Sequence, residues 1–155
     1  MYRLPARAYS SPQNFFIMEE TLLQSEALVL AQKNMLDYFQ THDPKYVAED
    51  GVFRNMNTGE VYTGREEVAG MLHFIYRVVF DGHAEIDNYL ITEDKAMMEG
   101  RITGKHIGDM GPIKATGKDV NYPICVTYRL RDGLISEANI YAANEILMQQ
   151  LGLAE

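Results

Sequence analysis

The sequence predicts an α+β domain in which helices pack on a strongly curved, mostly antiparallel sheet. Two segments, 19–40 and 63–79, place apolar residues at helical spacing. Four strand-like segments then follow one another with turn residues between them and no intervening helix. This order is typical of an α+β fold and not of a parallel βαβ fold. Long twisted strands curl, and helices covering the concave face of such a sheet leave a pocket between the layers.

The first expected helix covers residues 19–40, and its apolar positions cluster on one face. A short second helix is expected from Pro44 to about Glu49, because Asp43 can cap it and proline suits the first helical position. The clustered residues of the first helix are Leu22, Leu23, Leu28, Met35, Leu36 and Phe39.

A third helix is expected after a short strand at 52–56 and a turn at 57–59. Thr63 and Glu66 have the spacing of a capping box, so the helix should begin there and run through Val79. Because this segment is apolar around most of its circumference, we expect it to be largely buried.

The strands complete the expected element order. Turn residues at 92–95 and 131–133 join strands that are next to each other in the sequence. The four strands are expected at 84–92, 95–107, 118–131 and 134–142.

Composition excludes several classes of protein. A chain of 155 residues has the length of one domain, and a formal net charge of -8 argues against a nucleic-acid partner. No apolar run approaches the length of a membrane span, so no membrane association is expected. Cys125 is the single cysteine, which excludes an intrachain disulfide and favours a cytoplasmic protein.

The first eighteen residues differ from the rest of the chain. They contain Arg3 and Arg7 and no acidic residue, which is faintly similar to an organellar transit peptide. Their apolar positions show no sustained helical period, so we interpret 1–18 as an N-terminal arm and 19–155 as the domain. An arm of this kind could reach a second subunit.

Several short motifs stand out in the last third of the chain: Thr103-Gly104-x-His106-x-Gly108, Ala115-Thr116-Gly117-Lys118, Arg131-Asp132-Gly133 and Gln150-Leu151-Gly152. This set resembles the SnoaL-like polyketide cyclases of the nuclear-transport-factor-2-like superfamily. The resemblance extends from about Leu28 to Gly152. It implies a cone-shaped (cystatin-like α+β) barrel with a deep internal pocket, chemistry without a cofactor, and a homodimer packed through the outer face of the sheet.

The chain departs from this family at one position. Where SnoaL-like cyclases carry a catalytic aspartate that takes a proton from the polyketide, this chain has Ala143, which cannot act as a base. Strand alternation is expected to place Glu137, Asn139 and Tyr141 on the same pocket-facing side as Ala143. Two interpretations stay open: another residue is the base, or the protein does not catalyse this reaction.

This chain also lacks the catalytic carboxylates of two other enzyme classes that are related by fold. Asn55 matches an asparagine that helps to hold the attacking water in limonene epoxide hydrolases, but Phe53 stands in place of their tyrosine. Thr103 and Ile140 fall where their aspartates would be. The base aspartate of ketosteroid isomerases would fall near Asn55.

Histidines are the remaining candidates for acid–base catalysis. His73 lies in an apolar helix, where its ring must find a partner or face the cavity, and it is the preferred base. His106 is either a second acid–base group or a residue that stabilises its loop by hydrogen bonding. His42 and His83 lie next to turns and are expected to be solvated.

Further polar side chains are candidates for ligand binding. Arg101 either forms an ion pair with Glu99 or anchors an anionic substrate group. Tyr141, as a catalytic group, and Tyr38 can donate hydrogen bonds to a ligand oxygen. Cys125 is interpreted as an inert thiol, and the sequence shows no metal-ligand spacing. The expected ligand-binding set is Asn55, Arg101, Asn139, Tyr38 and Glu137.

These observations lead to two alternative functions. The first is a cofactor-independent cyclase, isomerase or dehydratase (a lyase or an isomerase) acting on a small apolar carbonyl compound in an internal pocket. The second is a non-catalytic module of the same fold that binds a small molecule or forms a dimer. An open pocket with convergent polar groups would favour a ligand or a substrate, and a filled interior would favour assembly.

Overall fold

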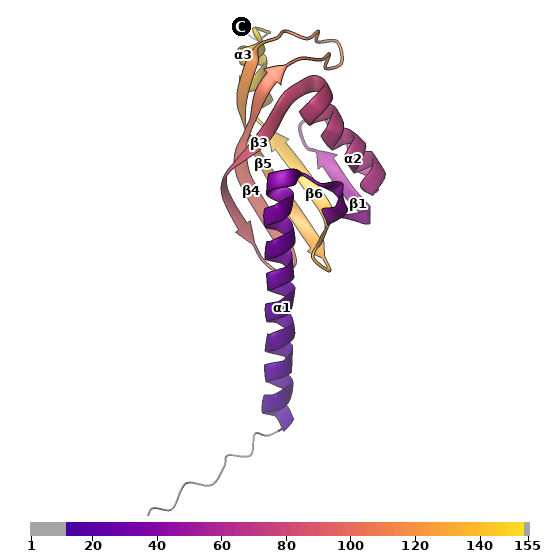
Figure 1. Cartoon of the computed structure of the whole chain (residues 1–155), viewed down its shortest axis with the longest axis vertical. Helices are drawn as coiled ribbons and strands as arrows, with labels where there is room; N and C mark the ends of the chain where they lie inside the picture. The colour runs from indigo at the N-terminus through magenta and orange to yellow at the C-terminus, as the bar shows by residue number, and fades with distance from the viewer. Residues whose placement is uncertain (1–11, 154–155) are drawn as a thin grey trace, which may run out of the picture.

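Helices cover one face of a six-stranded, strongly curved sheet (Figure 1), as the sequence predicts. The structure is a computed structural model, and it describes residues 12–153. The strand order is β2-β1-β6-β5-β4-β3, so the sheet is open and β2 and β3 are its edges. The strands are β1 (Val47–Asn55), β2 (Val61–Thr63), β3 (Phe80–Ile91), β4 (Lys95–His106), β5 (Asp119–Arg131) and β6 (Leu134–Ala142).

The pairing of these strands explains the curvature. Strands β3 to β6 form an antiparallel meander, and β1 adds to β6 as the one parallel pair in the described sheet. The register shifts between Ile86 and Asn88 in β3 and between Arg129 and Leu130 in β5. Irregularities of this kind bend a strand and increase its twist. The expected strands after residue 84 are confirmed, and β2 is a strand that the sequence pattern did not indicate.

Helix α1 (Pro12–Thr41) is longer than expected, because it begins before Glu19. Proline at the first position and no glycine or proline in the following residues favour a continuous helix. Only its C-terminal part packs on the sheet, where Ala31, Met35 and Tyr38 are buried. Residues 1–11 of the expected arm lie outside the described residues, and the rest of that arm is helical.

The chain turns sharply after α1. Asp43 accepts a hydrogen bond from the backbone N–H of Lys45 (2.9 Å), as the capping prediction requires. The helix that follows is only the short 3₁₀ helix η1 (Pro44–Tyr46). The expected extension to Glu49 is wrong, because β1 already begins at Val47 and continues the sheet.

Helix α2 (Arg65–His73) continues into the π-helical η2 (Phe74–Val79). The capping prediction is off by one position, since Glu67 and not Glu66 accepts the hydrogen bond from the backbone N–H of Thr63 (2.7 Å). The expected burial is also wrong for part of this segment. Phe74 and Val78 are more than 40% exposed because only one side of the segment faces the sheet.

The core lies between the helices and the concave face of the sheet. Alternate residues of β5 are buried there, which is the period of a strand with one covered face. Helix α3 (Asn144–Leu151) closes one end, and Gly152 ends it in the left-handed conformation (φ 78°). Among the described residues, no helix is both long and apolar enough to cross a membrane.

Candidate functional site

A cavity of about 300 Å³ lies between the concave face of the sheet and the helices. Residues of α1, α2, η2 and α3 line one side of it, and residues of the sheet, mainly from β1, β4, β5 and β6, line the other. Mostly apolar walls with a few polar groups are typical of small-molecule sites. Its apolar walls include Phe53, Met71, Ile75, Phe80, Met98 and Ile124.

Five tyrosines line this cavity, and four of them lie in its interior walls. Tyr38 comes from the end of α1, Tyr76 from η2, and Tyr122 and Tyr128 from the same face of β5. The rings of Tyr38 and Tyr128 meet edge to face, with centroids 6.1 Å apart. Within the described part of the chain, none of the four hydroxyls has a hydrogen-bond partner among the side-chain bonds that the structure forms. They are therefore free to bind water or a ligand.

Burial keeps these hydroxyls protonated. It raises the pKa of Tyr76 to about 12. Burial raises the pKa values of Tyr38, Tyr122 and Tyr128 further, and the nearby Tyr76 hydroxyl adds to each shift because a second negative charge would be repelled. At neutral pH the cavity thus presents neutral donors, which can hydrogen-bond to a ligand oxygen.

His42 lies beside this cluster and not in solvent as the sequence suggested. Its backbone is left-handed (φ 50°), which turns the chain back at the end of α1. Its ring centroid lies 5.0 Å from that of Tyr38 and 5.0 Å from that of Tyr76. Burial lowers the pKa of His42 to about 4, so the imidazole is neutral at physiological pH.

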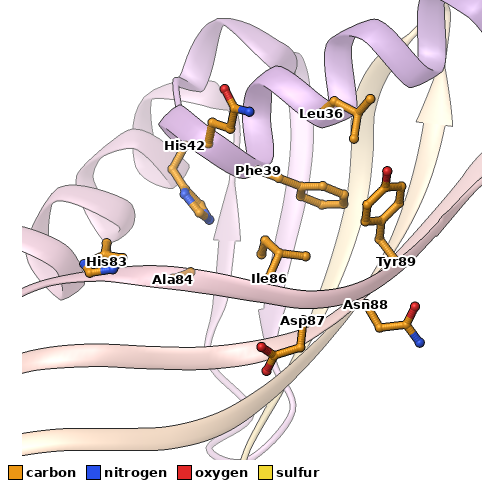
Figure 2. A pocket seen from close by; sticks show the side chains of 10 residues that line it. Leu36, Phe39, His42, His83, Ala84, Ile86, Asp87, Asn88 and Tyr89 are labelled. Carbon is orange, nitrogen blue, oxygen red and sulfur yellow. The ribbon is translucent and has the colours of Figure 1, made fainter.

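His42 also borders a second hollow. An open groove of about 820 Å³ runs between α1 and β3, and Figure 2 shows His42 and Phe39 on one side of it and Ile86 and Tyr89 on the other. The imidazole therefore separates the internal cavity from a groove that is open to solvent.

Polar residues from β1, β2, the turn between these strands and α3 form the rim of the cavity. Glu60 is the one carboxylate in the lining of the described residues, and it is exposed. It accepts hydrogen bonds from Thr58 (3.1 Å) and Tyr62 (3.4 Å). Asn55 lines the cavity as well, but its side-chain oxygen Oδ1 accepts a hydrogen bond from the backbone N–H of Asn57 (3.0 Å), which leaves its side-chain N–H₂ for a ligand.

The structure brings only two of the sequence-predicted site residues, Tyr38 and Asn55, into the cavity. His73 was expected in a buried helix, but it is exposed on the outer side of α2, beside Arg77 and Thr41. The buried face of α2 is narrower than the composition of the helix indicates. His73 is therefore not placed to reach a ligand in the cavity.

The expected face of the last strand is wrong by one residue. Ile140 and Ala142 line the cavity, and Ala138 is fully buried on the same side. Tyr141 is therefore on the opposite, outer face and is 47% exposed. Ala143 follows the end of β6 as the N-cap of α3, so strand alternation no longer applies to it.

Three more candidates lie on the outer face of the sheet. Glu137 forms ion pairs with Arg54 (3.3 Å) and Arg129 (4.0 Å). Asn139 is not in the cavity lining, and its side-chain oxygen is buried without a hydrogen-bond partner among the described residues.

Arg101 is likewise on the outer face. It pairs with Glu85 (2.6 Å) and Asp87 (3.0 Å) of β3, so the expected ion pair with Glu99 is wrong. Cross-strand neighbours lie closer to the guanidinium than the residue two positions away on its own strand.

His106 is fully buried at the end of β4 but is not part of the cavity lining. Its Nδ1 accepts the backbone N–H of Thr116 (3.2 Å) and lies 3.0 Å from the Thr116 hydroxyl. The ring also packs on Phe80, with centroids 5.6 Å apart. This geometry fits the interpretation of a histidine that holds the connection between β4 and β5.

Cys125 is partly buried, and both burial and the charge of Glu99 raise the pKa of its thiol. A thiolate is disfavoured at this position, which agrees with the interpretation of an inert thiol. Among the described residues, no cluster of histidine, cysteine, aspartate or glutamate side chains could hold a metal ion.

The sequence did contain signals for the residues that were missed. Tyr122 and Tyr128 lie six residues apart on one strand, so they share a face. Tyr38 and His42 are one helical turn apart at the end of α1, where side chains meet. The turn motif that follows His42 suggested solvent exposure, and only the tertiary packing of η2 over it shows otherwise.

Comparison with known proteins identifies a family and a fold. A family model described as SnoaL-like polyketide cyclase matches residues 29–151. No curated protein sequence matches the chain significantly.

Three solved structures illustrate the shared fold. A candidate SnoaL-like polyketide cyclase from a Jannaschia species has a TM-score of 0.72 at 14% identity, over 83% of this chain and 95% of that one. A phenazine biosynthesis-related protein from Pseudomonas aeruginosa has a TM-score of 0.71 at 15% identity, over 85% and 91%. A protein with a ketosteroid isomerase-like fold from Catenulispora acidiphila, solved with trimethylamine, has a TM-score of 0.63 at 20% identity, over 79% and 92%.

Proposed function

Since the chain belongs to the SnoaL-like polyketide cyclase family, we propose that it binds a small, largely apolar carbonyl compound in the cavity and transfers a proton on it without a cofactor. The observation that carries this proposal is the group of tyrosine hydroxyls that have no partner among the described residues and lie beside the neutral imidazole of His42. A cavity of about 300 Å³ holds about ten non-hydrogen atoms at the density of liquid water.

The tyrosines are suited to stabilise an enolate. A ligand carbonyl oxygen would accept hydrogen bonds from hydroxyls such as those of Tyr38 and Tyr128. When a proton leaves the neighbouring carbon, negative charge develops on this oxygen, and fixed donors in an apolar site stabilise it strongly. Because burial keeps the hydroxyls protonated, they are donors at the start of the reaction.

His42 is the group placed to accept the proton. The C–H bond breaks, a bond to the free imidazole nitrogen forms, and the electron pair moves into the enolate. The low pKa of His42 makes it a weak base in the empty cavity. An enolate beside the ring would stabilise the imidazolium, because a nearby opposite charge favours the charged form. The enolate then either takes the proton back at another carbon or attacks a second carbonyl group to close a ring. In the second case the new alkoxide takes the proton from the imidazolium, which returns His42 to its neutral form.

Proton exchange at the carbon next to a ketone tests this proposal directly. The protein would be incubated in D₂O with a panel of cyclic and aromatic ketones of about ten non-hydrogen atoms, and deuterium uptake would be followed by NMR. We expect His42→Gln to abolish protein-dependent uptake while thermal-shift assays still detect binding. Wild-type protein that binds members of the panel without exchanging deuterium would contradict the catalytic part.

A non-catalytic ligand-binding protein is the second candidate. It is favoured by the absence of a buried carboxylate from the described cavity lining and by the low pKa of His42. It predicts that ketones stabilise the protein to heat, that Tyr38→Phe and Tyr128→Phe weaken this effect, and that no substrate is turned over. The exchange experiment therefore separates the two functions.

A further inference from the structure

The N-terminal half of α1 lies outside the region that matches the family. The family match begins at residue 29, whereas the helix begins at Pro12. Figure 1 shows this part of α1 extending away from the sheet. The shared fold therefore does not explain its surface.

Four apolar side chains form a row along α1, beginning in this part and continuing into the C-terminal half of the helix. Met18, Leu22, Val29 and Leu36 follow one another at spacings of four, seven and seven residues, and each is between 39% and 63% exposed. Residues at this heptad spacing lie on one face of a helix. Exposed apolar rows of this length mark interaction surfaces. We call these residues the α1 row.

Charged residues lie along one flank of the α1 row. Glu19, Glu26 and Lys33 are seven residues apart, which places all three on the same flank, and all are exposed. Neither Glu26 nor Lys33 takes part in an ion pair among the described residues. A spacing of seven residues is about 10 Å along the axis, too far for pairing within one helix.

We propose that a second copy of this chain packs its α1 antiparallel along the α1 row, with Met18 of each copy against Leu36 of the other. In an antiparallel pair, the charged flanks of the two helices face each other. This register places Lys33 of one copy between Glu19 and Glu26 of the second copy. The unpaired charges then become complementary. In a parallel pair, this flank of one helix would instead face the opposite flank of the other helix, and that flank packs against the rest of the domain.

The groove beside α1 continues the proposed interface. Leu36 and Phe39 line it from α1, and Ile86 and Tyr89 line it from β3 (Figure 2). The rings of Phe39 and Tyr89 lie 5.9 Å apart, and Tyr89 is 48% exposed. In the antiparallel register, the first turns of the second copy's α1 extend past Leu36 toward this groove.

Sedimentation of the full chain tests the interface. We expect a dimer whose dissociation constant rises at least about 100-fold in the Leu22→Glu, Val29→Glu double variant, because charges replace buried apolar groups. Leu90→Glu, at an exposed position on the edge strand β3, is the matched control and should not weaken the dimer. Circular dichroism would verify that each variant keeps its fold. A monomeric wild type would overturn the proposal. So would a dimer that dissociates in Tyr141→Glu, a substitution on the outer face of the sheet, but not in the double variant.

Charge reversal shows whether the contact is between copies. Lys33→Glu alone and the Glu19→Lys, Glu26→Lys double variant should each weaken self-association about tenfold, because like charges then face each other. An equimolar mixture of the two should associate as tightly as wild type, since opposite charges meet at both ends. A mixture no tighter than its components would contradict the arrangement.

Cross-linking fixes the direction of the helices. In a Cys125→Ala background, a Met18→Cys chain mixed with a Leu36→Cys chain should form a disulfide-linked pair. Each chain alone should not, because the two positions are about 27 Å apart along the helix and identical positions do not meet. Self-cross-linking of the Met18→Cys chain would indicate a parallel pair and overturn the antiparallel proposal.

Discussion

The ring of His42 lies 5.0 Å from the ring of Tyr38, one helical turn earlier in α1. The backbone N–H of His42 donates to the carbonyl oxygen of Tyr38 (2.7 Å), and the left-handed conformation of His42 then ends the helix. The same turn that stops α1 thus places an imidazole between the cavity and the outer groove. Positive φ is uncommon for residues other than glycine, and residues held in sparsely populated conformations often lie at functional sites.

The first prediction concerns the pH dependence of folding. Burial lowers the pKa of His42 from 6.5 to about 4. Between these values the unfolded state binds a proton at His42 and the folded state does not, so stability falls as pH falls. The shift corresponds to about 3 kcal/mol, lost between neutral pH and pH 4. Urea unfolding at several pH values should show that His42→Gln removes this part of the pH dependence.

His83→Gln is the matched control for that measurement. The side chain of His83 is 67% exposed, so comparing the two variants separates the effect of the buried imidazole from that of removing any histidine. If His42→Gln and wild type lose stability in parallel between neutral pH and pH 4, His42 is not buried as described.

The second prediction separates ligand-binding hydroxyls from structural ones. The hydroxyl of Tyr128 has no hydrogen-bond partner among the described residues, so Tyr128→Phe should leave the free energy of unfolding unchanged or slightly higher. The hydroxyl of Tyr46 donates to the carboxylate of Asp37, so Tyr46→Phe should destabilise the protein by about 1 kcal/mol. Ketone binding should respond in the opposite way, weakening in Tyr128→Phe and not in Tyr46→Phe. Urea unfolding and thermal shift with a bound ketone measure the two effects.

The third prediction concerns His106. Its Nδ1 holds Thr116, and its ring is fully buried. Replacement by leucine removes this acceptor and leaves the Thr116 N–H without a partner, which should cost about 2 kcal/mol. Amide exchange should accelerate across 107–117, while deuterium exchange into a bound ketone should stay at the wild-type rate. Loss of catalysis with a stable loop would instead assign His106 to the reaction.

The strands were predictable because their signals are local. Strand alternation and the turn at Arg131-Asp132-Gly133 fixed the meander, and the left-handed φ values of Asp132 (53°) and Gly133 (74°) explain why those residues form the turn. The element order and the family motifs were sufficient to infer the α+β class.

The site was less predictable because it depends on which face of each element is covered. Tyr141 and Ala142 are adjacent, so an error of one residue in the assumed face moves every candidate of β6 out of the cavity. The burial of His42 depends on η2 packing over the end of α1, which no local pattern encodes. Asn55 was identified because it matches an asparagine of related enzymes, and Tyr38 because a tyrosine can donate a hydrogen bond to a ligand oxygen.

The last prediction uses this pair of neighbours to test where ligands bind. Ala142 lines the cavity and Ala143 does not, although they are adjacent in the chain. Ala142→Leu adds three carbon atoms to a cavity of about 300 Å³, so it should weaken ketone binding about tenfold by excluding the ligand. Ala143→Leu adds the same atoms outside the lining and should bind ketones as wild type does. Calorimetric titration of both variants decides the point: equal losses would place the ligand elsewhere, because only one of the two side chains borders the cavity.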